Sequence, residues 1–437
     1  LRSFTEHNLK NSLSQEKVHD EFYLSRQAVK HVWYNRIMHK KLRILYLSIF
    51  PFYGSGSGTY ARYLAKTVNK KHTVAIVSPD ARPVNGAKLY LLDAPYKVAF
   101  TGHPEWPDCQ LFTEISNMQI LELHKSYLDS CAKAVEDFKP DIIHVHHGFP
   151  FSWAARFMKS TYQVPYVITI HGSELPTAQK DKRYIALSMD SLRKARRIIP
   201  NSNYTKDWTL KVFGDEFRSN MRVIPGGVDI ARFKPVSTAA IDKELDLKGK
   251  KVVVFAGKLT KYKGVNFLVK AAIKIHGEVL IVGNGPERAR LEEMVKEKNI
   301  KNVRFLGHVG DQTDKLVALY SRADVFVAPS IWDEPLGLVI LEAMACETPV
   351  VVTRKGGIPL AVKEGKNGLF VKPRNSNDIA LTVNKLLDDE PLRQKMGKKA
   401  REIAITRFSW EMIGEKFIHI YEKFAEPRIW IENQKKL

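Results

Sequence analysis

Short apolar segments recur along this chain in two series, and each segment is followed by a stretch of helical character. Alternation of this kind predicts βα units whose parallel strands form a sheet with helices on both faces. The first series of expected strands lies at 42–47, 73–77, 142–145, 166–170, 198–199 and 222–224. The second lies at 252–256, 279–282, 303–306, 324–328, 350–352 and 369–371. Residues 225–229, Pro-Gly-Gly-Val-Asp, interrupt the pattern and are predicted to be a hinge.

The chain has 437 residues, which is too long for one ordinary core and suits two domains of roughly 200 residues each. The strand series place the first domain at 41–224 and the second at 225–408. Residues 1–40 precede the first strand and carry apolar residues at helical spacing, so an accessory helical extension is expected there. Residues 409–437 form the final segment.

Two glutamates, Glu334 and Glu342, lie eight positions apart around the start of a predicted helix at 338–345. Glu334 follows the expected strand at 324–328, and ligands of open α/β sheets bind at such carboxyl ends. Glu342 falls inside the helix among apolar neighbours, where an unpaired carboxylate would be costly. The helix N-terminus offers free N–H groups to an anion, and Gly337 lets the anion approach closely. Two solvated surface glutamates are the plainer alternative.

The segment from Pro329 to Glu342 resembles the donor-site signature of the retaining glycosyltransferases of family 4. The resemblance spans roughly residues 42–425 and implies the GT-B fold, in which two Rossmann-like parallel-sheet domains face a central cleft. It implies that the first domain binds the acceptor, the second binds the nucleotide sugar, and a terminal helix crosses back to the first domain. Glu334 would meet the donor sugar and Glu342 the ribose. The segment Pro335, Leu336, Gly337, Leu338 and Val339 would face the sugar and the diphosphate.

Two lysines, Lys258 and Lys263, follow the first strand of the second domain. By the resemblance they clamp the diphosphate and stabilise the leaving group, although the family usually has Arg at the first position. Fixed cations can neutralise a diphosphate without a metal, so neither a metal nor a cofactor is predicted. Lys258 supplies a point charge where Arg would supply a bidentate fork. Solvated loop lysines are the plainer alternative.

A glycine-rich loop at 54–60 follows the first strand and opens a helix, the context of a phosphate-binding turn. Its spacing does not match the G-x-G-x-x-G of a dinucleotide-binding dehydrogenase, which is the obvious competitor. The resemblance makes Gly58 the glycine nearest the reacting phosphate. It also places His171, at the end of the expected strand 166–170, beside the donor sugar and the acceptor. The denser cluster at 144–147 is expected to be packed structure, with a metal site as the alternative.

The loops at 283–286 and 305–307 end consecutive strands of the second domain. By the resemblance they frame the nucleotide through Gly283, Asn284, Gly285, Phe305 and Leu306. Backbone recognition does not encode the base in side chains, so the donor is left as a UDP- or GDP-sugar.

The net charge is +22, from 69 Lys and Arg against 47 Asp and Glu. A basic protein of this kind attracts anionic membranes or phosphorylated substrates. The basic residues are dispersed without the motifs of a nucleic-acid module, so no nucleic-acid partner is expected. The expected partners are a nucleotide sugar and an unidentified acceptor, phosphorylated or lipid-linked, with peripheral contact to an anionic membrane.

The three cysteines are far apart and lack metal-type spacing, which argues for a reducing compartment. No apolar run approaches the ~20 residues of a membrane span. A cytoplasmic protein is therefore expected, with a peripheral position at the inner face of the membrane as the second expectation.

The sequence thus predicts a glycosyltransferase that acts on nucleotide sugars. Two alternatives stay open: a nucleotide-sugar epimerase of the same fold, and a non-catalytic sugar-nucleotide-binding subunit. The pair Glu334 and Glu342 with Gly337 favours transfer over epimerisation. The presence of Lys258, Lys263, His171 and both glutamates argues against a protein that has lost its activity.

Overall fold

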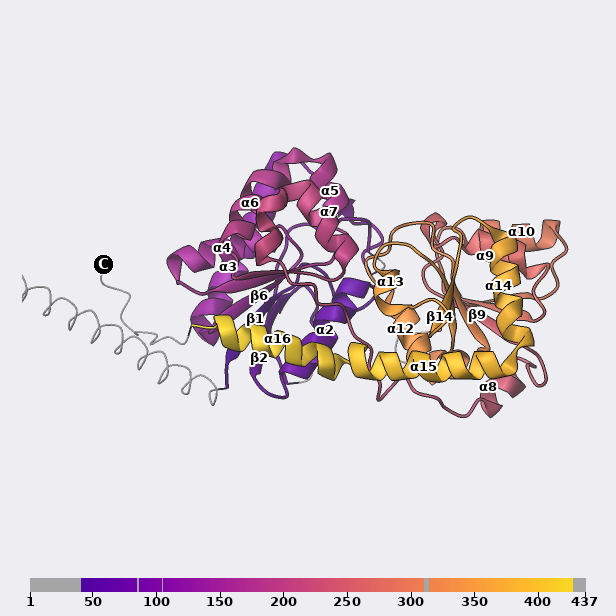
Figure 1. Ribbon diagram of the computed structural model, residues 1–437. Coiled ribbons are helices and arrows are strands. Elements are labelled where there is room, and N and C mark those ends of the chain that lie inside the picture. The colour runs from indigo at the N-terminus through magenta and orange to yellow at the C-terminus, as the bar shows by residue number, and fades with distance from the viewer. Residues whose placement is uncertain (1–40, 85, 104, 310–313, 427–437) are drawn as a thin grey trace, which may run out of the picture.

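Two six-stranded parallel sheets dominate the computed structural model, and each has the doubly wound strand order (Figure 1). The structure describes residues 41–84, 86–103, 105–309 and 314–426, so the predicted extension at 1–40 and the last residues of the final segment lie outside the described residues. The first sheet has the order β3-β2-β1-β6-β7-β8: β3 Lys88–Leu91, β2 Thr73–Ser78, β1 Arg43–Leu47, β6 Ile142–His146, β7 Tyr166–Ile170 and β8 Arg197–Pro200.

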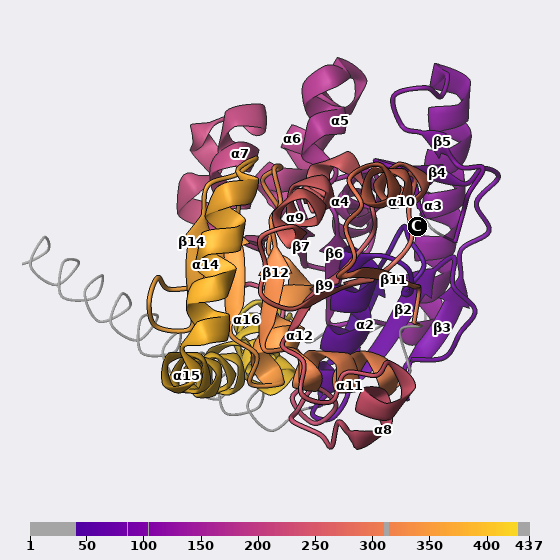
Figure 2. The ribbon, with the colours of Figure 1, turned by 90° about the vertical axis from the view of Figure 1, so that its right-hand side faces the viewer.

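The second sheet repeats this order, and in Figure 2 it lies in front of the first. Its strands are β11 Val303–Gly307, β10 Glu278–Val282, β9 Val252–Ala256, β12 Val325–Ala328, β13 Val350–Thr353 and β14 Gly368–Val371. Strands β9, β12 and β13 are buried throughout, as expected for runs of Val, Phe and Ala covered on both faces. The predicted fold of two Rossmann-like domains is confirmed.

Helices cover both faces of each sheet and create two apolar cores per sheet. The helices that follow strands of the first sheet are α2 Gly56–Val68, α3 Asn117–Phe138, α4 Phe151–Thr161, α5 Leu175–Lys180, α6 Ile185–Lys194 and α7 Asn203–Phe213. Those of the second part are α8 Ala239–Glu244, α9 Val265–Ala272, α10 Arg288–Glu297, α11 Asp314–Arg322, α12 Leu338–Ala345, α13 Ile358–Ala361, α14 Ser376–Asp388 and α15 Glu390–Phe408. The helix predicted at 338–345 is confirmed as α12.

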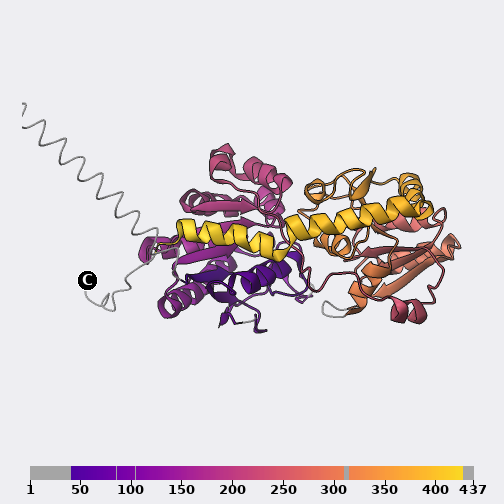
Figure 3. The ribbon, with the colours of Figure 1, turned by 60° about the horizontal axis from the view of Figure 1, so that its bottom comes forward.

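The last described helix, α16 Trp410–Phe424, continues the line of α15 and packs on α2 beside the first sheet (Figure 3). Its Tyr421 hydroxyl lies 2.9 Å from the Tyr46 hydroxyl of β1 and 2.7 Å from His144 Nδ1 of β6. The chain therefore passes between the two sheets twice. The two passages are joined, because Val228 donates to the Phe408 carbonyl at 2.8 Å and Trp410 donates to the Val228 carbonyl at 3.2 Å.

Two details differ from the sequence prediction. Residues 222–224 form no strand: Arg222 and Ile224 donate to the carbonyls of Ile198 and Pro200, and only Met221 forms an isolated bridge. Pro225 follows at once and has no N–H to extend the ladder. In the other direction, the sequence predicts no strand within 80–115, yet this stretch contains the edge strand β3 and the short strands β4 Val98–Ala99 and β5 Gln110–Leu111.

Candidate active site

The polar residues predicted to act on substrate follow the carboxyl ends of the central strands, where parallel strands direct their connecting loops to one edge. His171 follows β7, Lys258 and Lys263 follow β9, and Glu334 follows β12. The two domains meet at this edge. A Cβ placed on Gly172 would lie 3.2 Å from Pro335 Cγ, and one on Gly357 would lie 2.8 Å from Ser202 Cβ.

Lys263 and Glu334 contact each other directly. Lys263 Nζ donates to Glu334 Oε2 at 2.7 Å, and the two side chains are 29% and 12% exposed. The other carboxylate oxygen of Glu334 accepts the Ser330 hydroxyl. Lys263 ends a short 3-10 turn, Lys261–Lys263, that comes straight after β9. The residue predicted to hold phosphate and the residue predicted to hold sugar therefore form one ion pair.

Gly337 begins α12 in the left-handed conformation, with φ 78° and ψ 70°, and no side chain caps this helix. The N–H groups of its first turn therefore point away from the helix without a side-chain acceptor. Glu334 Oε2 lies 3.6 Å from the position of a Cβ on Gly337. The carboxylate and the open helix end thus lie side by side, as the sequence predicted. Leu336 is buried, and Leu338 and Val339 are half-buried at the same turn.

Two further glycines, Gly356 and Gly357, hold the loop that carries Glu334. Gly357 donates to the Glu334 carbonyl at 2.7 Å, and Gly356 donates to Asp333 Oδ1 at 2.9 Å. A Cβ on Gly357 would lie 1.9 Å from the Pro335 carbonyl oxygen, so no larger residue fits there. These contacts fix the Glu334 backbone independently of Lys263.

Glu342 lies on α12 and accepts the Tyr320 hydroxyl at 3.0 Å. A carboxylate among apolar neighbours requires a partner, and Tyr320 of α11 supplies one. The Tyr320 ring is completely buried, and burial is the main reason that its pKa is raised well above the usual value.

The loops after β9 and β10 interlock through their backbones. Gly283 donates to the Gly307 carbonyl at 2.7 Å, and Leu259 donates to the Asn284 carbonyl at 2.8 Å. A Cβ on Gly283 would lie 2.0 Å from the Gly257 carbonyl oxygen, and one on Gly285 would lie 2.3 Å from that of Leu259.

Gly283 and Gly285 are therefore required for the packing of these loops, whether or not they also contact a ligand. The Asn284 amide oxygen accepts Arg288 Nη1 at 2.6 Å. Phe305 and Leu306, at the end of β11, are half-buried and pack on opposite cores of the second domain. Lys258 itself is exposed.

Gly58 lies in the first turn of α2, not in the open part of its loop. Its N–H donates to the Ser55 hydroxyl at 3.1 Å, and a Cβ there would lie 2.3 Å from the Pro51 carbonyl oxygen. Gly56 has open space around it. Within this loop, Gly56 is therefore better placed than Gly58 to approach an anion.

His171 is buried, at 5% exposure, and its Nε2 lies 3.1 Å from His146 Nδ1. Burial lowers the pKa of His171 to about 3, so its ring is neutral at ordinary pH. His144 is fully satisfied, because its two ring nitrogens lie 2.7 Å from Tyr421 Oη and 2.8 Å from Thr169 Oγ1. This arrangement agrees with the structural role expected for His144.

Glu174 is a buried carboxylate that the sequence did not reveal. It accepts the N–H groups of Gly148, His171 and Gly172 at 2.8–3.2 Å, and so ties the end of β7 to the end of β6. Burial raises its pKa to about 7, although these N–H groups act in the opposite direction. Glu174 lies at the start of the short helix α5, and no sequence pattern there predicts that its side chain binds these N–H groups.

Trp332 is a second residue that was missed. Its ring is 45% exposed and lies 5.4 Å from the ring of Tyr262 and 6.3 Å from that of Trp208, which belongs to the first domain. Aromatic rings from both domains therefore meet beside the Glu334 loop. Within the described ranges, no group of three or more His, Cys, Asp or Glu side chains is arranged to hold a metal ion.

Comparison with known proteins identifies the family of this chain. Residues 54–232 match the family described as Glycosyltransferase Family 4, and residues 237–403 match Glycosyl transferases group 1. A D-inositol 3-phosphate glycosyltransferase of Corynebacterium jeikeium is 32% identical over 311 residues, which cover 65% of this chain and 72% of that protein. The chain belongs to glycosyltransferase family 4.

Solved structures share the fold of this glycosyltransferase. Sucrose-phosphate synthase from Thermosynechococcus elongatus superimposes with a TM-score of 0.71 at 24% identity, covering 88% of this chain and 99% of that one. Anabaena HepE in complex with UDP and glucose superimposes with a TM-score of 0.68 at 19% identity, covering 88% and 100%. The expected GT-B fold and transferase class are confirmed. Across the described part of the chain, no helix is both long and apolar enough to cross a bilayer.

Proposed function

We propose that this glycosyltransferase moves a hexose from a UDP- or GDP-sugar to an acceptor hydroxyl, with retention of anomeric configuration and without a divalent metal. The observation that carries the proposal is the contact of Lys263 with Glu334 beside the uncapped start of α12. One cation, one carboxylate and the N-terminus of a helix suit a ligand that joins a diphosphate to a hydroxyl-rich sugar.

The diphosphate lies at the N-terminus of α12 in this proposal, with Lys258 and Lys263 as its counter-charges. The bond between the anomeric carbon and the phosphate oxygen breaks, and the acceptor oxygen attacks the same face of the sugar. The departing phosphate oxygen takes the acceptor proton, so no separate strong base is needed. Glu334 orients the sugar hydroxyls and does not attack. Because burial keeps His171 neutral, it positions groups by hydrogen bonding and is not a proton donor.

The donor is proposed by analogy with the protein whose structure is described as a complex with UDP and glucose. The loop at Gly283 would lie near the phosphates and ribose, and the loop backbone at Leu306 would contact the base, which leaves UDP and GDP as the two candidates. Tyr320 fixes one oxygen of Glu342 at 3.0 Å. The proposal assigns Glu342 to the ribose hydroxyls of the donor.

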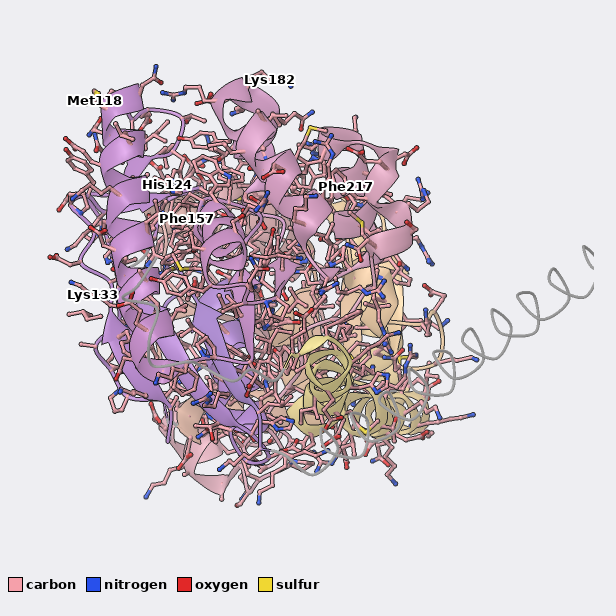
Figure 4. All side chains as sticks on the ribbon, turned by 90° about the vertical axis from the view of Figure 1, so that its left-hand side faces the viewer. Met118, His124, Lys133, Phe157, Lys182 and Phe217 are labelled. Atoms are coloured by element: carbon pink, nitrogen blue, oxygen red, sulfur yellow. The ribbon has the colours of Figure 1, made fainter. Side chains whose placement is uncertain are left out.

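The acceptor domain presents a basic outer face. In the segment 180–197, Arg183, Arg193 and Arg196 are ion-paired with Asp181, Glu216 and Glu426. Lys180, Lys182 and Lys194 are exposed there. Phe157 of α4 is 49% exposed and lies on the same side as Lys182 (Figure 4). Apolar and basic side chains together support peripheral contact of this domain with an anionic membrane that carries a lipid-linked acceptor.

The deciding experiment incubates the purified protein with UDP- and GDP-linked hexoses and follows nucleotide release, with and without a chelator. Release that persists with the chelator, and a product whose anomeric configuration by NMR equals that of the donor, are expected. Loss of release that magnesium or manganese restores would contradict metal independence, and an inverted product would contradict retention. A nucleotide sugar that changes its stereochemistry without an acceptor would indicate the epimerase instead.

A further inference from the structure

His146 and His171 lie side by side at the carboxyl ends of β6 and β7, and their rings are bonded to each other. His146 Nδ1 is 3.1 Å from His171 Nε2. The ring centroids are 5.4 Å apart, so both nitrogens point along the line that joins the rings. The strand register brings the rings together, because His146 is opposite Thr169 and His171 follows two positions later on the same face. One proton therefore lies between the two rings, and its position determines what His171 can do.

Each of these rings carries one proton. Both are enclosed, His146 at 1% and His171 at 5% exposure. Burial is the main reason that the pKa of each ring falls well below its usual value. A neutral imidazole has one N–H and one bare nitrogen. Two arrangements satisfy this count: either His146 Nδ1–H donates to a bare His171 Nε2, or His171 Nε2–H donates to a bare His146 Nδ1.

The second ring nitrogen of His146 distinguishes the two arrangements. His146 Nε2 is enclosed and has no hydrogen-bond partner among the described residues. If His171 were the donor, the proton of His146 would lie on Nε2, as an enclosed N–H group without an acceptor. Buried N–H groups without a partner are rare in proteins, and rarer than unpaired acceptors. His146 therefore carries its proton on Nδ1 and is the donor of the shared bond.

The direction of this bond fixes the tautomer of His171. Its Nε2 is bare and occupied, so its proton lies on Nδ1. Nδ1 has no partner among the described residues and, unlike His146 Nε2, is not enclosed. The next residue, Gly172, meets the second domain, since a Cβ on it would lie 3.2 Å from Pro335 Cγ, directly after Glu334. The open side of His171 therefore presents an N–H donor where the two domains meet.

The orientation of the His171 ring is also fixed. The backbone N–H of His171 donates to Glu174 Oε1 at 3.1 Å, and its carbonyl accepts Asn201 Nδ2 at 2.9 Å. The Tyr60 ring of α2 packs against the imidazole at 5.0 Å, perpendicular to it. Rotation of the imidazole by half a turn would break the bond to His146. The hydrogen bond to His146 therefore sets both the orientation and the tautomer of His171.

We propose that His146 is a positioning residue for the transfer reaction: its Nδ1–H binds His171 Nε2 and so confines the His171 proton to Nδ1, which donates a hydrogen bond to a substrate oxygen. The proton stays on the ring throughout. This rests on the proposed transferase function and assigns a further role within the same site. Because the bare nitrogen of His171 is occupied, the ring does not take a proton from the acceptor hydroxyl. This agrees with the departing phosphate as the base.

NMR reads the tautomer directly, on protein whose histidine rings carry ¹⁵N. Long-range ¹H–¹⁵N spectra separate protonated from bare ring nitrogens, and the His171 signals are those missing from His171→Asn. In the wild type, His171 is expected to show a protonated Nδ1 and a bare Nε2. A protonated Nε2 would overturn the proposal. The measurement needs no substrate.

Two variants of His146 test the cause. His146→Leu removes the donor, so His171 is expected to lose the pure Nδ1–H pattern, and kcat/KM for nucleotide release should fall on the order of tenfold, as for one lost hydrogen bond. His146→Asn keeps an N–H donor near the position of Nδ1, so the pattern and most of the activity should be retained. If His146 served packing alone, the apolar Leu would suit this enclosed position better than Asn, and the order would be reversed.

The matched control is Tyr421→Phe. The Tyr421 hydroxyl lies 2.7 Å from His144 Nδ1, and the His144 ring lies 4.4 Å from that of His146. The variant removes a buried hydrogen bond next to His146 but leaves the bond to His171. Its His171 pattern and its kcat/KM are expected to equal those of the wild type. The same change of pattern as in His146→Leu would overturn the assignment to His146.

An unchanged Nδ1–H pattern in folded His146→Leu would also overturn the proposal. Absence of nucleotide release with every sugar nucleotide would instead refute the proposed function. The spectra, recorded without substrate, distinguish these two failures.

Discussion

Replacement of Lys263 by alanine tests the proposed donor site most directly. The wild-type side chain lies 2.7 Å from Glu334 and is 29% exposed, so its charge is partly screened by solvent. In the proposed reaction it faces the phosphate charge that grows as the sugar departs. One well-placed group of this kind contributes about 3 kcal/mol, which corresponds to a loss on the order of 10²-fold in kcat/KM.

The cost to folding is much smaller. Partly exposed ion pairs are worth roughly 0–1 kcal/mol, and Glu334 keeps the Ser330 hydroxyl as a partner in the variant. A loss of about 1 kcal/mol lowers the melting temperature of a domain of this size by roughly 2–4 °C. The protein would remain folded at 25 °C, so a large kinetic loss could not be attributed to unfolding.

The assay measures nucleotide release over a range of donor concentrations, together with thermal unfolding. Lys261→Ala is the matched control, because Lys261 lies in the same 3-10 turn and is exposed. It removes the same charge from the loop without removing the contact to Glu334. Wild-type kcat/KM in folded Lys263→Ala, or an equal loss in Lys261→Ala, would refute the assignment.

Three further outcomes are expected. Gly357→Ala forces a Cβ to 1.9 Å from the Pro335 carbonyl oxygen, so it should lower both nucleotide release and the melting temperature. Unchanged values for both would show that the loop moves to accommodate the Cβ and would contradict the prediction. Burial lowers the pKa of His171 to about 3, below its unfolded value, so the free energy of unfolding should fall as pH drops from 6.5 toward 3, measured by urea titration; a flat profile would contradict the buried neutral ring. Anionic vesicles should sediment the protein at low salt and release it at high salt, and Lys182→Glu combined with Phe157→Ser should weaken this binding; absence of binding at low salt would exclude membrane contact through this face.

The sequence was sufficient for the fold because the central strands are continuous apolar runs. Strands such as β9 and β12 are buried on both faces. Their continuous runs of apolar residues show no helical periodicity, so they are not mistaken for helices. The edge strands were harder to predict from the sequence. β3 is the sequence Lys-Leu-Tyr-Leu with both ends exposed, and it obtains its pairing from β2. An edge strand of this kind differs little from a loop until its neighbour is known.

The charged part of the site was also predictable, since Lys263 and Glu334 each follow a strand and parallel strands end at one edge. Their direct contact was not, because it depends on how two loops 71 positions apart fold over each other.

The glycines of the site show why motifs do not distinguish packing from ligand binding. The family resemblance predicts Gly58 to be the glycine nearest the phosphate, yet its N–H is bonded to Ser55 and its missing side chain makes room for the Pro51 carbonyl. Gly283 is likewise required, because a Cβ there would lie 2.0 Å from the Gly257 carbonyl oxygen. Alanine at either position would disturb the loops before it disturbed any ligand. A variant of Lys263, whose side chain bonds the Glu334 side chain and not a loop backbone, therefore reports on donor binding more directly than variants of the conspicuous glycines.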